Sequence, residues 1–278
     1  MKKFIVAFLI LLFVIAPAAL GLYLWMEIPS DKEIKGCMTT TMYHVHLCPK
    51  SPQYVPLKKI SPYMLKTVVM TEDSTFWQNQ GFDWDSIKRN YEENSKLGYY
   101  KRGGSTITQQ LAKNMFLTGK KSLIRKGIEA LITLRIDQVL TKREVLERYL
   151  NVIEFGKNIY GIKAASQHYF QKSPADLNIV ESAFLAMLLP NPKKYAASFY
   201  KKELTPFASK RITQIIDHLY EYHNINDEEY SEALTQLENF FHPPESVEEG
   251  QEAYSTDEDL TLDKLEKATT EEDEENNK

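Results

Sequence analysis

Two adjacent acids, Glu72 and Asp73, stand among hydrophobic residues in the stretch TEDSTFWQNQG, residues 71–81. A carboxylate at a helix end with apolar neighbours such as Val69 and Phe76 has its pKa raised by desolvation, and an adjacent like charge raises it further. A raised pKa suits a general base that acts near neutral pH. The alternative is a solvated helix terminus without a chemical role.

A glycine pair followed by hydroxyl and amide side chains occupies residues 103–114, GGSTITQQLAKN. The glycines allow close backbone approach and unusual dihedral angles. We expect Ser105 to start a helix whose free N–H groups favour an anion, and Lys113 to share a helix face with Gln109 and Gln110. This polar row suits recognition of a sugar and a phosphate; the alternative is an ordinary capped helix. It is not a nucleotide-binding P-loop, because no Gly-Lys-Ser/Thr follows at the required spacing.

A third group, RKGIEA, places Arg125 and Lys126 four and three residues before Glu129, so that all three can share one helix face. The arrangement suits a cationic site for a pyrophosphate, with Glu129 assisting the reaction or holding a divalent ion. The alternative is a surface salt bridge, which contributes only about 0.3–0.5 kcal/mol.

Helical patterns predominate between residues 56 and 242, and strand-like alternation is nearly absent. Residues 122–140 carry apolar side chains at helical spacing, and a further helix is expected over 212–222. The start signals of the other helices are Ser61 before Pro62, the capping box of Thr141 and Glu144, and the capping box of Asn178 and Glu181. We therefore predict a mainly α domain over residues 56–242 with one hydrophobic core.

Charge is distributed unevenly along the 278 residues, whose formal net charge is −4. Residues 245–278 hold 14 acids and 3 lysines, so this tail carries −11 and the remaining 244 residues carry +7. The tail also has few large apolar residues, and we expect residues 243–278 to be disordered. The basic body suits an anionic partner such as phosphate, lipid headgroups or nucleic acid.

The N-terminal segment has no charged residue over residues 4–26, a run of 23. Roughly 20 apolar residues cross a bilayer as a helix. Two lysines precede the run, so the positive-inside rule places the N-terminus in the cytoplasm and the body outside. We expect a cytoplasmic flank and membrane anchor over 1–27, followed by a stalk over 28–55. The alternative is a cleaved signal peptide, because an Ala-Pro-Ala sequence loosely resembles a cleavage site.

The two cysteines, Cys37 and Cys48, both lie in the predicted stalk. Outside the cytoplasm a pair that closes a short loop is expected to form a disulfide. His44 and His46 lie between them and make a metal site an alternative, although the spacing matches no common zinc pattern. Free thiols are the remaining alternative.

Taken in order, these segments resemble family 51 glycosyltransferases, the peptidoglycan glycosyltransferases that polymerise lipid II. EDSTFWQNQG, GGSTITQQLAKN, RKGIEA and KREVLERYLN follow one another as in that family, and FGKNIYGIKAASQHYFQKSPADLNIVESAFLAMLLPNP is similar to its later segment. The resemblance covers about residues 55–195, and GGSTITQQL is close to diagnostic. It implies an all-α or mainly α, lysozyme-like domain with two lobes behind one N-terminal transmembrane helix.

The resemblance also implies a reaction and roles for individual residues. Glu72 would take the proton from the 4-hydroxyl of lipid II, which attacks the anomeric carbon of a growing glycan and displaces polyprenyl pyrophosphate with inversion to a β-1,4 bond. Glu129 would be the second acid, near the leaving pyrophosphate, where Mg2+ or Mn2+ would offset developing negative charge. The residues implied in substrate binding are Asp73, Phe76, Ser105, Thr106, Gln109, Gln110, Lys113, Lys121, Arg125 and Lys126.

Two residues depart from the family pattern. Asn79 stands where the family usually has histidine, so the tuning around Glu72 is expected to differ. Lys121 stands where arginine is frequent, which keeps the charge but loses the bidentate fork for phosphate.

Organisation, location and partners are also implied. We expect a monofunctional enzyme, because Ser198 and Lys201 match the Ser-x-x-Lys pattern of a penicillin-binding domain only by chance and no Lys-Thr-Gly follows. The expected location is the bacterial inner membrane, with the catalytic domain outside the cytoplasm. The expected partners are lipid II, lipid-linked glycan, membrane lipid and other cell-wall synthesis proteins, but no nucleic acid. Residues 99–101, two tyrosines and a lysine, suit a membrane interface or a plain solvent loop.

Two rival functions remain open at this point. Lysozyme-like folds also cleave glycan with a glutamate acid, although GGSTITQQL and the second glutamate favour synthesis. The other rival is a catalytically silent membrane scaffold whose acidic tail recruits partners. Asn79 favours this rival, whereas the presence of both Glu72 and Glu129 opposes it.

Overall fold

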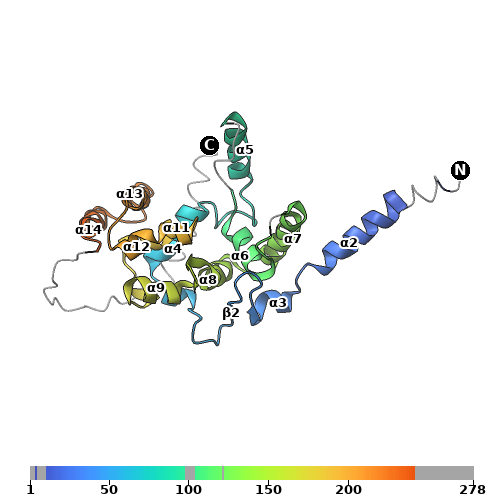
Figure 1. Cartoon of the computed structure of the whole chain (residues 1–278), viewed down its shortest axis with the longest axis horizontal. Helices are drawn as coiled ribbons and strands as arrows, with labels where there is room; N and C mark the ends of the chain where they lie inside the picture. Colours follow the sequence, from blue (N-terminus) through green and yellow to red (C-terminus); the bar gives the residue numbers. More distant parts are fainter. Residues whose placement is uncertain (1–3, 5–10, 98–103, 121, 242–278) are drawn as a thin grey trace.

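The computed structural model describes residue 4 and residues 11–97, 104–120 and 122–241 (Figure 1). Lys121, Gly103, the segment 99–101 and the acidic tail from residue 243 lie outside these ranges. The expectations for them therefore stay predictions.

Helices dominate the body, and the mainly α prediction is confirmed. In the described part of the chain the strands form two antiparallel pairs, β1 (Met38–Thr39) with β2 (His46–Leu47) and β3 (Glu154–Gly156) with β4 (Ile159–Tyr160). The short 3-10 helices are η2 (Leu57–Lys59) and η3 (Pro174–Asp176). The α-helices are α2 (Ala16–Met26), α3 (Asp31–Lys35), α4 (Pro62–Glu72), α5 (Trp84–Leu97), α6 (Ile107–Phe116), α7 (Leu123–Val139), α8 (Lys142–Val152), α9 (Ile162–Phe170), α10 (Ile179–Leu188), α11 (Pro192–Tyr195), α12 (Ala197–Lys201), α13 (Pro206–Glu221) and α14 (Asp227–Glu238).

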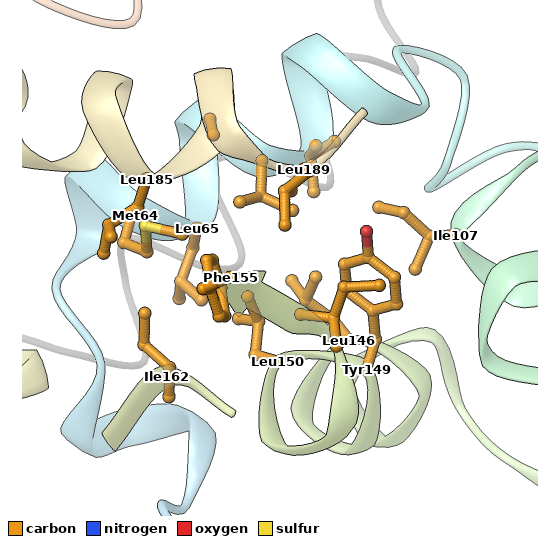
Figure 2. Packing of buried hydrophobic residues seen from close by; sticks show 14 of the residues in the cluster. Met64, Leu65, Ile107, Leu146, Tyr149, Leu150, Phe155, Ile162, Leu185 and Leu189 are labelled. Carbon is orange, nitrogen blue, oxygen red and sulfur yellow. The ribbon is translucent and has the colours of Figure 1, made fainter. Parts of the chain in front are cut away.

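Helix α10 lies at the centre of the hydrophobic core. Every one of its residues is buried, as expected for a helix that is apolar on nearly all faces. It packs against α4, α13 and α14. Figure 2 shows Met64 and Leu65 of α4 beside Leu185 of α10, with Phe155 of β3 close to them.

Helices α6, α7 and α8 form a second packed group, in which α6 contacts both of the others. Figure 1 shows α3 and α7 at one end of the body, α13 and α14 at the other, and α4 and α6 between them. The end of α4 and the start of α6 therefore meet where the two groups of helices join.

Helices α4, α7, α8 and α10 begin where the sequence predicts. Pro62 starts α4, Ser122 caps α7, and Thr141 and Asn178 cap α8 and α10 through complete capping boxes. Helix α13 begins before the predicted residue 212, because the Thr205 side chain supplies an N-cap there.

Residues 28–55 belong to the body, which corrects the expectation of a separate stalk. Ile34, Leu47 and Val55 from this segment are buried in the common core. Helix α3 packs against α7, and β2 packs against α8. Tyr43, Val45 and Leu47 alternate with polar residues, but three apolar positions are too few to indicate that the whole segment packs into the body.

The structure joins Cys37 and Cys48 in a disulfide, with 4.3 Å between their Cα atoms. The bond connects the two ends of the β1–β2 hairpin. His44 and His46 lie on this hairpin, but the described residues contain no group of three or more His, Cys, Asp or Glu side chains that could hold a metal ion.

Helix α2 follows a π-helical turn over Leu11–Ile15 and projects away from the body in Figure 1. Within the described ranges, no helix combines the length and the apolar character needed to cross a membrane. Residues 5–10 of the predicted anchor lie outside those ranges, so the anchor stays a prediction.

Candidate active site

The Glu72 side chain lies at the C-terminal end of α4, in the wall of a cleft of about 400 Å³. The cleft is bounded by this helix end, by α5 and by the backbone that leads into α6, with Arg89, Gly104 and Ser105 among its lining residues. A Cβ at Gly104 would lie 3.0 Å from Asn90 Nδ2 of α5, so a residue without a side chain allows this close approach.

The Glu72 carboxylate is held by an amide. Gln110 Nε2 of α6 donates a hydrogen bond to Glu72 Oε2 at 2.8 Å, and Lys113 follows one turn later on the same helix. Burial raises the pKa of Glu72, whereas the Gln110 hydrogen bond and the charge of Arg211 oppose the rise and Asp73 adds to it. A carboxylate with a raised pKa in a cleft wall is suited to accept a proton from a bound ligand.

Asp73 connects α4 to α6 through both of its carboxylate oxygens. Oδ2 accepts a hydrogen bond from the backbone N–H of Ile107 at 3.0 Å, and Oδ1 accepts one from Asn79 Nδ2 at 2.9 Å. Burial raises the pKa of Asp73 to about 6, although these two hydrogen bonds lower it. The side chain thus fixes the end of α4 at the N-terminus of α6, where the helix dipole favours a negative charge. Its predicted role in binding substrate stays a prediction.

Asn79, the departure from the family pattern, contacts Asp73 rather than Glu72. Its Oδ1 accepts hydrogen bonds from Lys142 Nζ at 3.2 Å and from the Gly81 N–H at 3.1 Å. The lysine is thereby placed next to the Asp73 network, and its charge lowers the pKa of Asp73. Asn79 thus acts directly on Asp73, and the expected change in the tuning of Glu72 stays a prediction.

Three residues implied in substrate binding also have clear structural contacts. Phe76 is fully buried, and Lys142 Nζ lies 5.2 Å from its ring centroid. Thr106, rather than Ser105, caps α6: its hydroxyl accepts a hydrogen bond from the Gln109 N–H at 3.1 Å, and Gln109 Oε1 accepts one from the Thr106 N–H at 3.0 Å. Thr106 and Ser105 both line the cleft, whereas Gln109 is buried in this capping box.

Glu129 lies on α7 with only 2% of its surface exposed, and two cations of the same helix bind it. Arg125 Nη1 lies 2.9 Å from Oε2, and Lys126 Nζ donates to Oε1. Arg125 Nε is buried and has no hydrogen-bond partner in the described part of the chain, and Lys126 is half exposed. Such fixed, charged donors suit a phosphate.

A divalent metal ion does not fit a protein-only site at Glu129. Both of its carboxylate oxygens are engaged by cations, which repel a second positive ion. Among the residues that the structure describes, no three His, Cys, Asp or Glu side chains come together around a metal position. The expected Mg2+ or Mn2+ therefore stays a prediction.

Sequence reasoning missed two residues near Glu72. Arg211 of α13 acts on the Glu72 carboxylate through its charge. Tyr149 of α8 donates a hydrogen bond from its hydroxyl to Gln110 Oε1 at 3.1 Å. Neither contact has a signal in a single sequence, because the partners lie far apart along the chain.

Ser198, the chance match to a Ser-x-x-Lys nucleophile, is fully buried. Its hydroxyl donates a hydrogen bond to Thr205 Oγ1 at 3.2 Å. A hydroxyl in this position cannot reach a substrate.

The segment that carries both glutamates matches a known protein family. Residues 39–219, well over half of the chain, match the family model described as Transglycosylase. The chain belongs to the transglycosylase family. The matched range begins in β1 and ends in α13, so it includes Arg211 and part of the segment expected to be a stalk. Family membership agrees with the mainly α, lysozyme-like fold implied by the motifs.

Curated relatives carry the name biosynthetic peptidoglycan transglycosylase. The relative from Aromatoleum aromaticum is 46% identical over 147 residues, which are 53% of this chain and 64% of the relative. The one from Herminiimonas arsenicoxydans is 45% identical over 152 residues, 52% of this chain and 66% of the relative. The one from Nitrosospira multiformis is 42% identical over 164 residues, 59% of this chain and 70% of the relative. The match to the first two thus spans slightly less than two thirds of their length.

Proposed function

We propose that this chain is a peptidoglycan glycosyltransferase that polymerises lipid II into β-1,4-linked glycan strands and releases polyprenyl pyrophosphate. Membership of the transglycosylase family and the names of the relatives support the proposal. The observation that carries it is the Glu72 carboxylate, which lies in the wall of an open cleft with its pKa raised by burial.

Glu72 acts as the general base in this proposal. It takes the proton of the acceptor 4-hydroxyl, and the oxygen attacks the anomeric carbon of the donor while polyprenyl pyrophosphate leaves. A base is most effective when its pKa is close to the working pH, which the burial of Glu72 favours. The Gln110 hydrogen bond at 2.8 Å fixes the position of the carboxylate in the cleft wall.

The cations of α7 receive the leaving pyrophosphate. Glu129 holds Arg125 and Lys126 in place, so less side-chain entropy is lost when they bind the anion. Lys126 is half exposed and Arg125 is partly exposed, so both side chains present N–H donors to the anion. In this role Glu129 positions the cations near the departing group.

A lipid-linked substrate places the reaction at a membrane surface, with the catalytic body outside the cytoplasm. The run of uncharged residues at the N-terminus and the basic body support this location. Membrane lipid and other cell-wall synthesis proteins are the further partners in the proposal.

The test is polymerisation of labelled lipid II by the detergent-solubilised full chain, with Mg2+ or Mn2+ varied. We expect glycan polymer from the wild type and none from Glu72→Gln. Glu221→Gln is a matched control, because it removes an exposed carboxylate of α13 that does not line the cleft, and it should remain active.

Two other results would replace the proposal. Release of soluble muropeptides from cell-wall sacculi, without polymer, would identify a lytic enzyme. Absence of product from the wild type in all conditions would favour a catalytically silent scaffold.

A further inference from the structure

Tyr149 has a buried hydroxyl that is directed toward Gln110, the residue that holds Glu72. The side chain is fully buried on α8, and Figure 2 shows its phenol oxygen directed away from the helix, on the side where Ile107 of α6 lies. In the described part of the chain this hydroxyl has one hydrogen-bond partner, Gln110 Oε1, at 3.1 Å. Burial and the nearby Glu72 and Asp73 carboxylates raise the pKa of Tyr149 well above its ordinary value, so the phenol keeps its proton.

The Gln110 amide can satisfy both neighbours in only one orientation. An ionised carboxylate accepts hydrogen bonds and donates none, so the amide NH2 has to face Glu72. The amide oxygen then faces Tyr149, whose buried hydroxyl needs an acceptor. If the amide turned over, its oxygen would face the Glu72 carboxylate and the Tyr149 proton would lose its acceptor.

We propose that Tyr149 is a positioning residue for the proposed reaction: its hydroxyl locks the Gln110 amide so that the NH2 faces Glu72 and holds that carboxylate ionised and in place. The role of Tyr149 in catalysis rests on the proposed function. The coupling of Tyr149 to Glu72 through Gln110 rests on the contacts alone.

Other charged groups also act on Glu72 and stay unchanged when Tyr149 is altered. Arg211 of α13 favours the ionised form, and Asp73 at the end of α4 opposes it. Arg89 and Glu93 of α5 line the same cleft. A change at Tyr149 therefore reports on the Gln110 hydrogen bond rather than on the net charge of the cleft.

The experiment compares Tyr149→Phe with Tyr169→Phe. Tyr169 is also buried, and its hydroxyl donates to the Phe155 carbonyl at 2.9 Å, outside the Glu72 network. Each variant removes one buried tyrosine hydroxyl, so the two should lose similar thermal stability. The first readout is the pH dependence of kcat/KM for lipid II polymerisation. The second is the titration of the Glu72 carboxyl carbon by carbon-13 NMR, assigned from its loss in Glu72→Gln.

Tyr149→Phe should move the acid limb of the kcat/KM profile and the NMR titration of Glu72 to higher pH by about one unit. At pH values below the pKa of Glu72, kcat/KM of the variant should be about tenfold lower than that of the wild type. Tyr169→Phe should leave both unchanged. Adding Tyr149→Phe to Gln110→Met should produce no further shift, because the amide through which the hydroxyl acts is already gone.

An unshifted Glu72 titration in Tyr149→Phe would overturn the inference, as would an equal shift in Tyr169→Phe. If Tyr149→Phe melts too low to be titrated, Gln110→Met decides: an unchanged Glu72 titration there overturns the coupling. The NMR readout needs no substrate, so a chain that fails to polymerise lipid II but shows the shift would refute the proposed function and keep the coupling.

Discussion

The two glutamates that carry the proposed chemistry have opposite kinds of partner. Glu72, at the end of α4, is hydrogen-bonded to the neutral amide of Gln110, and burial raises its pKa. Glu129, on α7, is almost completely buried and is bound by the two cations Arg125 and Lys126. The elements that hold these two carboxylates both contact α6.

The difference shows how one side-chain type serves two purposes. A carboxylate that faces an amide in a desolvated cleft wall can change its protonation state, which a general base requires. A carboxylate between two cations is a counter-charge that fixes the cations in space. Removing the charge of Glu72 should therefore slow the reaction. Removing the charge of Glu129 should lower the stability of the fold around α7.

The largest expected effect is that of Glu72→Gln on the reaction. We expect kcat/KM for lipid II polymerisation to fall by about 10²–10⁴, because the variant has no base at this position. The melting temperature should not fall, since a desolvated charge is removed. Initial rates and thermal melting measure the two quantities. More than a tenth of the wild-type activity would show that Glu72 is not the base.

Glu129→Gln should act on stability. It leaves Arg125 and Lys126 without their shared counter-charge, and we expect the free energy of unfolding to fall by about 2 kcal/mol. Chemical denaturation measures this change, with Glu221→Gln as the exposed control. Equal stability of the two variants would mean that the α7 cations do not depend on Glu129, and the contrast between the two glutamates would fail.

Asn79→Ala should separate the Asp73 network from Glu72. The variant removes the donor to Asp73 Oδ1 and one acceptor of Lys142, which keeps its bond to Asp137, so the free energy of unfolding should fall by about 1 kcal/mol. The acid limb of the kcat/KM profile should move little, because Asn79 does not contact Glu72 and acts on it only through Asp73, the smallest of the influences on the Glu72 pKa. A displaced limb with unchanged stability would assign Asn79 to the tuning of the base.

The smallest expected effect is a pH dependence of stability. Because burial raises the pKa of Glu72, the folded chain holds this proton more tightly than the unfolded chain does. The contribution of Glu72 to stability is therefore present at low pH and is lost as pH rises through its folded pKa. Activity should change in the opposite direction, since the base has to be ionised. The difference in unfolding free energy between wild type and Glu72→Gln, measured between about pH 4 and pH 7, tests the sign.

Local patterns in the sequence were enough to predict several of the helices and the cluster of cations around Glu129, whereas the roles of the two glutamates came from the family resemblance and stay predictions. Thr141 and Asn178 cap helices as predicted, because a capping box is formed by residues within four consecutive positions. Arg125, Lys126 and Glu129 meet because they are three and four residues apart on one helix. Such contacts depend only on helix geometry.

The contacts that decide the environment of Glu72 could not be predicted, because they join distant parts of the chain. Gln110 is 38 residues from Glu72 and 39 from Tyr149. Asp73 reaches Ile107 across 34 residues, so its bond to the start of α6 has no local signal. These distances along the chain are bridged only when α4, α6 and α8 pack together.

The connection between α2 and the body has a mechanical consequence. Only residues 27–30 separate α2 from α3, and α3 is docked on α7, where Asp31 pairs with Arg135. Four residues span at most about 14 Å when fully extended. Any surface that holds α2 therefore also restricts the height and the tilt of the cleft relative to that surface.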